Sequence, residues 1–318
     1  MIFPTPSGTR DVLPDEMREL RAISETIRQV LDSSGYGEIY TPAIEYEDVL
    51  RRGQTGLDPA YRVFDEHGTV LALRPDMTVP IARVAATRYA SAEPPLRFCY
   101  FAHAYRAVEP HRGQMREFLQ AGVELLGSPA PDGTAEALTV LCRALDATGL
   151  QGYKVALGDA SLLPDLLRGF GVSDDRHAGV LRELVRGDFV GLERALGGLG
   201  LPASAQELVL TTLQARGGPE VLQDLPGKAE EAVLGMRRIR ELLDAPVAER
   251  IVFDLGLTRA PGYYTGAVFD VLDPALGAPI GGGGRYDDLL GRFGMDLPAV
   301  GWALGVDMLH LAIAGEER

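Results

Sequence analysis

Four short segments of this chain carry polar side chains in patterns that could bind a small charged molecule. In the first, residues 74–78 (Arg-Pro-Asp-Met-Thr), a carboxylate and a hydroxyl lie two positions apart and would project to one side of an extended backbone. Such a pair could hold an ammonium group. The same residues also fit a plain strand-to-helix turn, in which Asp76 or Thr78 caps a helix that starts near Val79. The sequence leaves both interpretations open.

The second group is Arg106, Gln120 and Glu124, which lie in or beside two β-prone segments, residues 96–107 and 118–126. If these segments pair as antiparallel strands, the three polar side chains lie among Phe and Tyr neighbours. A polar group in such surroundings needs a partner or a ligand. The alternative is that this side of the sheet faces solvent.

The third and fourth segments combine arginine, tyrosine and glycine. Arg259 precedes Tyr263 and Tyr264; an arginine offers five donors for a carboxylate, and a tyrosine offers a ring and a hydroxyl. Residues 263–266 also fit a hairpin with packed aromatic rings. Four consecutive glycines, residues 281–284, precede Tyr286 and would let the backbone approach a ligand closely. This run is not a P-loop, because the Lys-Ser/Thr ending is absent.

Composition limits the classes of partner and cofactor. The 318-residue chain has a formal net charge of −14 and no Lys/Arg cluster, so no nucleic acid partner is predicted. The five histidines have no metal-ligand spacing, so neither a metal nor a cofactor is expected. Cys99 and Cys142 stand alone in apolar surroundings, which favours the reducing cytoplasm. No apolar run approaches the ~18 residues of a membrane span.

The elements that must position these groups follow from apolar periodicity. A helix is predicted from Pro14 to about Gly35, and the following strand is interrupted at Pro42, which implies an edge or a bend. Helices are also predicted at 80–90, 134–148 and 301–313, a hairpin at 63–64 and 70–73, and strands at 36–46, 96–107, 118–126, 251–255, 263–272 and 280.

These elements indicate an α+β fold, with an antiparallel sheet flanked by helices and a helical insertion. Residues 161–249 are rich in Leu, Arg, Glu and Gly with helical periodicity, and they are predicted to form the insertion. Residues 1–160 and 250–318 are predicted to form the domain that contains the sheet.

Together the four segments resemble, in order and spacing, the catalytic domain of class II aminoacyl-tRNA synthetases, and histidyl-tRNA synthetases most closely. The resemblance implies that family's fold and an amino acid pocket. Residues 7–14 are similar to its N-terminal signature, Thr41-Pro42 to motif 1, residues 101–124 to motif 2, residues 301–309 to motif 3, and residues 259–264 and 283–287 to its two histidine-recognition segments.

The resemblance implies a nearly complete histidine pocket. Asp76 stands where the family has a glutamate, one methylene longer, and the other positions match. By resemblance, the ammonium group would be held by Asp76, Thr78 and Gln120, and the carboxylate side would face Arg259 and Gln120. The imidazole ring would be recognised by Glu124, Tyr264 and Tyr286. Arg106 is the eighth residue of the set.

The ATP side departs from the family pattern at four positions. Val108 replaces a glutamate that contacts adenine, Glu109 replaces a cation, and Gln114 and Met308 replace arginines. Losing one positioned donor costs on the order of 2.7–4 kcal/mol of transition-state stabilisation, so useful activation of an amino acid should be lost. The sequence also stops after motif 3, and the family's anticodon-binding domain is therefore expected to be absent.

This profile is similar to that of the histidyl-tRNA synthetase-like regulatory subunits of short-form ATP phosphoribosyltransferase, most of all at residues 118–127. The resemblance implies a non-catalytic protein that forms a hetero-octamer with the catalytic subunit (HisG). It would be required for the activity of that subunit and for its feedback inhibition by histidine in the first step of histidine biosynthesis. A homodimer through the motif 1 region around Pro42 is implied in the same way.

Two rival hypotheses remain open at the level of sequence. One is a truncated but active histidine-activating ligase, against which Met308 argues. The other is a stand-alone sensor, or another synthetase paralogue, without the catalytic subunit as its partner.

Overall fold

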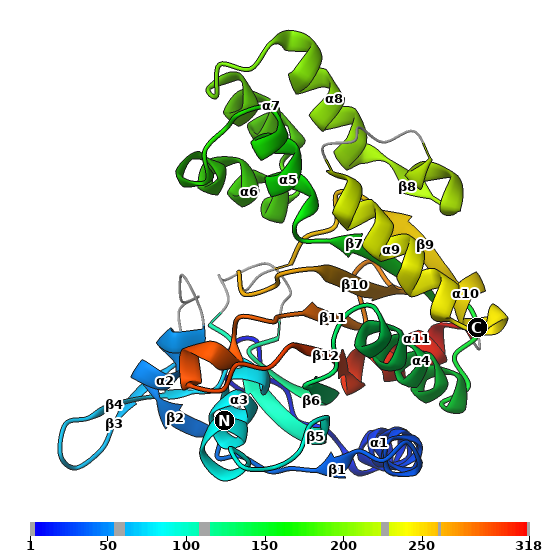
Figure 1. Cartoon of the computed structure of the whole chain (residues 1–318). Coiled ribbons are helices and arrows are strands. Elements are labelled where there is room, and N and C mark those ends of the chain that lie inside the picture. Colours follow the sequence, from blue (N-terminus) through cyan, green and yellow to red (C-terminus); the bar gives the residue numbers. More distant parts are fainter. Residues whose placement is uncertain (1–3, 54–60, 108–114, 224–228, 260–261, 317–318) are drawn as a thin grey trace.

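A mixed nine-stranded sheet forms the centre of the molecule. The computed structural model describes residues 4–53, 61–107, 115–223, 229–259 and 262–316. Neighbouring strands are antiparallel from β5 through β7, whereas β1 pairs with β5, and β7 with β9, in parallel (Figure 1). The strand order is β1 (Gly37–Glu38), β5 (Leu96–Tyr105), β6 (Glu117–Leu126), β12 (Ala299–Gly305), β11 (Gly281–Arg285), β10 (Ala267–Leu272), β7 (Lys154–Asp159), β9 (Ile251–Asp254) and β8 (Arg216–Gly217).

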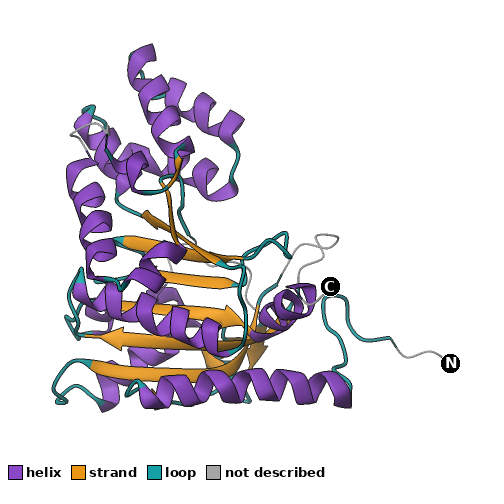
Figure 2. Ribbon diagram, turned by 90° about the vertical axis from the view of Figure 1, so that its right-hand side faces the viewer, coloured by secondary structure: helices purple, strands orange, loops and turns teal. Residues whose placement is uncertain are grey.

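Helices cover one face of this sheet, as Figure 2 shows. They are α1 (Pro14–Ser33), α4 (Asp132–Ala147), α9 (Glu230–Leu242) and α11 (Val306–Glu316). The predicted first helix is confirmed: Pro14 starts it, acidic residues occupy its first turn, and Leu20, Ile27 and Leu31 face the core. Trp302 is the largest side chain buried beneath these helices, and its indole nitrogen donates to the Ala137 carbonyl at 3.0 Å.

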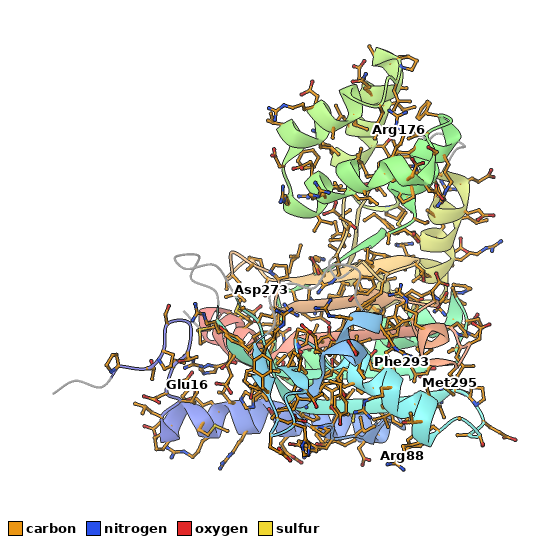
Figure 3. All side chains as sticks on the ribbon, turned by 90° about the vertical axis from the view of Figure 1, so that its left-hand side faces the viewer. Glu16, Arg88, Arg176, Asp273, Phe293 and Met295 are labelled. Atoms are coloured by element: carbon orange, nitrogen blue, oxygen red, sulfur yellow. The ribbon has the colours of Figure 1, made fainter. Side chains whose placement is uncertain are left out.

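The opposite face is covered over part of its length by a second, smaller layer. This layer contains the three-stranded sheet β2 (Ile44–Tyr46), β4 (Val70–Leu73) and β3 (Arg62–Phe64), and the helices α2 (Glu47–Gly53), α3 (Thr78–Arg88) and η4 (Leu290–Phe293). The predicted hairpin is confirmed as the pair β3–β4. Met77 and Ile81 pack there with Tyr100, and Phe293 and Met295, labelled in Figure 3, complete the cluster.

Between β7 and β9 the chain forms mostly helices. A helical cluster beyond β7 contains α5 (Leu162–Gly169), η1 (Asp174–Arg176), α6 (His177–Arg186), α7 (Phe189–Gly197) and α8 (Ala203–Gln214) (Figure 1). The chain then returns through β8 and η2 (Pro219–Leu222). Helix α9 packs against α4 and β7, and α10 (Ala245–Arg250) leads into β9.

The structure corrects three of the predicted elements. The helix predicted at 301–313 begins only at Val306, because Val300, Trp302 and Leu304 alternate with small residues and pair as strand β12 between β6 and β11. The glycine run, for which the sequence predicts no element, forms strand β11. The strand predicted at 263–272 starts at Ala267, and the segment predicted at 36–46 is divided between the two sheets on either side of Pro42.

The predicted antiparallel pairing of residues 96–107 with 118–126 is confirmed as β5–β6. The fold class is confirmed as well: an antiparallel core sheet is flanked by helices, and a helical segment is inserted between its strands β7 and β9. In the described part of the chain, no helix has the length and apolar character needed to cross a membrane.

Candidate functional site

A patch of small residues lies at the centre of the sheet face that α1 and α4 leave uncovered. Strand pairing sets Glu124 opposite Gly301, Gly301 opposite Gly284, and Gly282 opposite both Ala303 and Asp270. Directly opposed residues share a face. The floor therefore consists of Gly122, Gly301, Ala303, Gly305, Gly282 and Gly284, with Gln120 and Glu124 on one side and Asp270 on the other.

Two of these glycines are required by the polar groups beside them. A Cβ on Gly301 would overlap with Oε2 of Glu124, and a Cβ on Gly282 would overlap with Nη1 of Arg259 and lie 2.6 Å from Oδ1 of Asp270. The sequence pattern indicated close approach of the glycine run to a ligand. The structure shows that the missing side chains make room for the polar side chains above the sheet, and the approach of a ligand stays a prediction.

Glu124 is the most deeply buried acid of the site, with 1% of its surface exposed. The hydroxyl of Thr78 donates to its Oε1 at 2.7 Å, and the hydroxyl of Tyr286 donates to its Oε2. Burial raises the pKa of Glu124 to about 8, although the two hydroxyl donors act in the opposite direction and the charge of Asp76 adds to the increase. This carboxyl group therefore retains its proton near neutral pH.

Asp76 and Thr78 fit both sequence interpretations. The backbone N–H of Val79 donates to Oδ1 of Asp76 at 3.2 Å, as expected for a residue at the start of a helix. Asp76 is nevertheless buried and close enough to Glu124 to affect its pKa. Thr78 is the first residue of α3 and directs its hydroxyl to Glu124.

The third segment does not form a hairpin. Its Tyr263 and Tyr264 pack with Tyr286 into a group of rings that we call the tyrosine wall. The rings of Tyr263 and Tyr264 lie 4.9 Å apart, and those of Tyr263 and Tyr286 lie 5.7 Å apart, between centroids. Arg259 reaches the sheet from the loop before β10, where its guanidinium forms an ion pair with Asp270. Sequence reasoning missed Asp270, although a charge between Phe269 and Val271 in an apolar strand was a usable signal.

Gln120 and Arg106 differ in their surroundings. Gln120 is 8% exposed, and within the described residues its Oε1 has no hydrogen-bond partner. Arg106 is exposed: its Nε donates to the Pro75 carbonyl at 3.3 Å, and its guanidinium lies 5.0 Å from the ring centroid of Phe118. The structure therefore brings Thr78, Glu124 and Tyr286 into direct contact and places Arg106 at the rim.

The motif 3 position contains no cation. Met308 lies on α11 and packs against the main core, and Asp307 beside it pairs with Arg10 at 2.8 Å. Val108, Glu109 and Gln114, the other three altered positions, lie outside the described residues. Arg74 of the first segment is buried and donates to the carbonyls of His103 and Thr41, so it connects β5 to the motif 1 segment.

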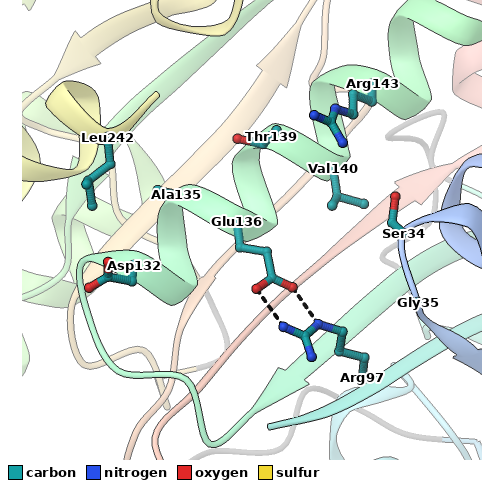
Figure 4. Close-up of a pocket in the computed structure, with 10 residues that line it drawn as sticks. All are labelled: Ser34, Gly35, Arg97, Asp132, Ala135, Glu136, Thr139, Val140, Arg143 and Leu242. Atoms are coloured by element: carbon teal, nitrogen blue, oxygen red, sulfur yellow. Dashed lines mark hydrogen bonds and ion pairs between the residues drawn. The ribbon is translucent and has the colours of Figure 1, made fainter. Parts of the chain in front are cut away.

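A separate depression of about 530 Å³ lies on the helix-covered side of the sheet (Figure 4). Ser34, Glu136 and Arg143 are among its lining residues, and Glu136 is paired there with Arg97 at 2.7 Å. It contains none of the predicted site residues. No cluster of His, Cys, Asp or Glu suited to a metal ion occurs among the residues that the structure describes.

The fold and the glycine-floored pocket define a domain of the class II aminoacyl-tRNA synthetase type. The histidyl-tRNA synthetase family model matches residues 8–309. The ATP phosphoribosyltransferase regulatory subunit of Symbiobacterium thermophilum is 40% identical over 316 residues, covering 96% of this chain and 79% of its own. The chain belongs to the histidyl-tRNA synthetase family, which includes the regulatory subunits of ATP phosphoribosyltransferase.

Other relatives are named as histidine–tRNA ligases or as ATP phosphoribosyltransferase regulatory subunits. The histidine–tRNA ligase of Thermococcus kodakarensis is 37% identical over 318 residues, covering 95% of this chain and 72% of its own. A crystal structure from Bacillus halodurans, described as an ATP phosphoribosyltransferase regulatory subunit/histidyl-tRNA synthetase, superposes with a TM-score of 0.90 at 31% identity, over 98% of this chain and 83% of that one.

Proposed function

We propose that this chain is the non-catalytic regulatory subunit of ATP phosphoribosyltransferase, which activates the catalytic subunit and makes it sensitive to histidine. The observations that support the proposal are the buried polar cluster of Thr78, Glu124 and Tyr286 and a motif 3 position occupied by Met308. The names of relatives that match 96% of the chain support it.

The absence of amino acid activation follows from charge. Transfer to or from a triphosphate depends on cations positioned around the phosphates. Met308 is partly buried against the core, and Arg10, which pairs with the adjacent Asp307, is also paired with Glu16. The net charge of −14 also opposes a polyanionic tRNA partner.

Histidine is the ligand that the pocket suits best. Glu124 and Tyr286 offer a carboxyl and a hydroxyl for the two ring nitrogens, and the tyrosine wall offers apolar surface for the ring. Asp76, Thr78 and Gln120 would face the ammonium group. Arg259 would face the carboxylate, in a bidentate geometry that arginine favours.

For histidine in this pocket to regulate the complex, its binding must be coupled to the active site of the catalytic subunit. A ligand changes a distant activity only through a difference in its binding to two states, with a coupling typically of ~1–3 kcal/mol. We expect histidine to bind the pocket in both the free chain and the complex, and to stabilise the inactive assembly.

An exposed apolar face supports homodimerisation near motif 1. On the three-stranded sheet, Ile44 and Tyr46 are 47% and 57% exposed, and Val63 lies on the same face. Leu71 and Leu73 complete this face by register. Contiguous apolar patches of this kind usually mark interfaces.

The deciding experiment is an assay of the short-form catalytic subunit with and without this chain, followed by addition of histidine. We expect activity only in the mixture, inhibition by histidine, and loss of that inhibition in Glu124→Ala. A chain that neither binds nor activates the catalytic subunit would refute the proposal. Capture of a different partner from the native extract would favour a stand-alone sensor.

A second candidate is a histidine-activating ligase, because a relative named histidine–tRNA ligase covers 95% of the chain. Histidine-dependent exchange between ATP and pyrophosphate would support it. We expect none, for the reasons of charge given above.

A further inference from the structure

Asp270 is a charged residue in an otherwise apolar strand of the pocket. Its β10 neighbours Val268, Phe269 and Val271 are fully buried, and its own side chain is only 15% exposed. A carboxylate in such a position is costly unless it is paired. Its partner is Arg259, whose side chain is 25% exposed.

The neighbouring strand provides the space for this pair. Gly282 lies opposite Asp270 in the β10–β11 register, and a Cβ there would collide with Nη1 of Arg259 and approach Oδ1 of Asp270. The ion pair therefore occupies a volume that β11 leaves open by having no side chain at this point.

The ion pair with Asp270 fixes the orientation of the Arg259 side chain. It lies in the loop before β10, and a loop alone leaves a long side chain many rotamers. Its Nη1 is engaged by Asp270 and by the Phe269 carbonyl at 3.5 Å. Its Nε is buried and, among the described residues, has no partner. A buried donor without a partner is a place for a ligand's acceptor.

We propose that Asp270 is a positioning residue, which holds Arg259 on the sheet so that its remaining donors meet the carboxylate of the bound amino acid. This inference rests on the proposed function, in which histidine occupies the pocket. The opposite arrangement, in which Asp270 competes with the ligand for Arg259, predicts tighter binding when Asp270 is neutralised.

The test measures binding of two ligands to the intact chain by calorimetry. L-histidinol retains the ring and the ammonium group of L-histidine but lacks its carboxylate. Asp270→Asn should weaken L-histidine binding on the order of 10-fold, the range expected for loss of a charge-assisted hydrogen bond. Binding of L-histidinol should be unchanged, and Asp270→Glu should restore part of the L-histidine affinity.

Two further variants separate positioning from a general structural effect. Asp270→Asn added to Arg259→Ala should cost no further L-histidine affinity, because the two residues act in series. Glu136→Gln breaks a comparable pair with Arg97 on the opposite face and should leave both ligands unaffected. If Asp270→Asn does not fold, Asp270→Ser removes the same charge with a smaller side chain and should give the same pattern.

The outcomes separate this inference from the proposed function. A wild-type chain that binds no histidine overturns the pocket assignment and this inference with it. A wild-type chain that binds histidine, with Asp270→Asn binding it equally or more tightly, overturns the role of Asp270 alone. Equal weakening of both ligands, or an additive loss in the double variant, overturns it as well.

Discussion

Glu124 shows how the surroundings of one residue give a pocket its chemistry. An exposed glutamate is a permanent anion at neutral pH, but this one is enclosed by the sheet, α3 and Tyr286. Burial moves its pKa to about 8, so it can offer or accept a proton where histidine's ring also titrates.

The first prediction concerns the pH dependence of histidine binding. Between the ring pKa of about 6.5 and the Glu124 pKa of about 8, the free ring is neutral and Glu124 is protonated, so binding needs no net proton change. Affinity should fall below this window, because the ring must lose a proton, and above it, because Glu124 must regain one. Calorimetry across pH 5–9 measures this.

Glu124→Gln is the control for that profile. In this variant the affinity for histidine should no longer fall because of Glu124 ionisation at alkaline pH. The fall in affinity caused by deprotonation of the ligand's own amine should remain. An identical profile in the variant would contradict the assignment. In the empty protein the folded state holds this proton more tightly than the unfolded chain, so the free energy of unfolding should fall as pH rises from 4.5 towards 8.

The second prediction concerns Gly301. In Gly301→Ala the new methyl group would overlap with Oε2 of Glu124 and displace the carboxyl from Thr78 and Tyr286. We expect histidine binding to weaken by more than about 10-fold and the free energy of unfolding to fall by about 1–3 kcal/mol. Ser33→Ala, at the exposed end of α1, should change neither quantity.

At the level of elements, alternate residues of strand β12 lie on opposite faces of the sheet, one facing the site and the other facing the helical layer. Gly301, Ala303 and Gly305 floor the pocket, while Val300, Trp302 and Leu304 anchor the strand beneath α4. The strand thus supports the site without contributing a side chain that would fill it.

The third prediction separates these two layers. Trp302→Phe removes the hydrogen bond to the Ala137 carbonyl and leaves a cavity beneath α4. The free energy of unfolding should fall by about 1–3 kcal/mol, as measured by urea denaturation. Histidine affinity should be nearly unchanged, because the substitution lies on the other face; a large loss would show that the two layers are coupled.

At the scale of the whole molecule, we expect the open face of the small sheet to determine self-association, and the altered positions of motifs 2 and 3 to prevent catalysis. The apolar face formed by Ile44, Tyr46, Val63, Leu71 and Leu73 suits association, and the motif 3 position suits packing rather than phosphate binding.

The fourth prediction concerns that apolar face. In a two-fold symmetric dimer a charge introduced at Tyr46 faces the same surface of the second copy. Tyr46→Glu should weaken dimerisation on the order of 10-fold or more, as measured by sedimentation equilibrium. The control Val190→Glu, at a 67% exposed position of α7, should leave the dimer intact. If Tyr46→Glu and Val190→Glu change the dimerisation constant equally, the apolar face is not the dimer interface.

The fifth prediction concerns catalysis. Met308→Arg restores one cation of motif 3, but Val108, Glu109 and Gln114 remain. Histidine-dependent exchange between ATP and pyrophosphate should stay undetectable, because several positioned cations act together on a triphosphate. Measurable exchange in the single variant would show that Met308 alone separates this chain from an active ligase.

The amino-acid sequence was enough to predict the local elements with strong periodicity and the family. Helix α1, the β3–β4 hairpin and the β5–β6 pair follow from patterns within a few residues of one another. The side chains proposed for the pocket were also identified by type and spacing. Such features depend on neighbours in the chain, which a sequence displays directly.

Which of those side chains are in contact became clear only from the three-dimensional fold. Glycine carries no β signal of its own, so β11 becomes a strand through pairing with β10 and β12. The bond of Thr78 to Glu124 spans 46 residues, and the Arg259–Asp270 pair exists because Gly282 leaves it room. Contacts of this kind depend on sheet register, which sets distant residues side by side.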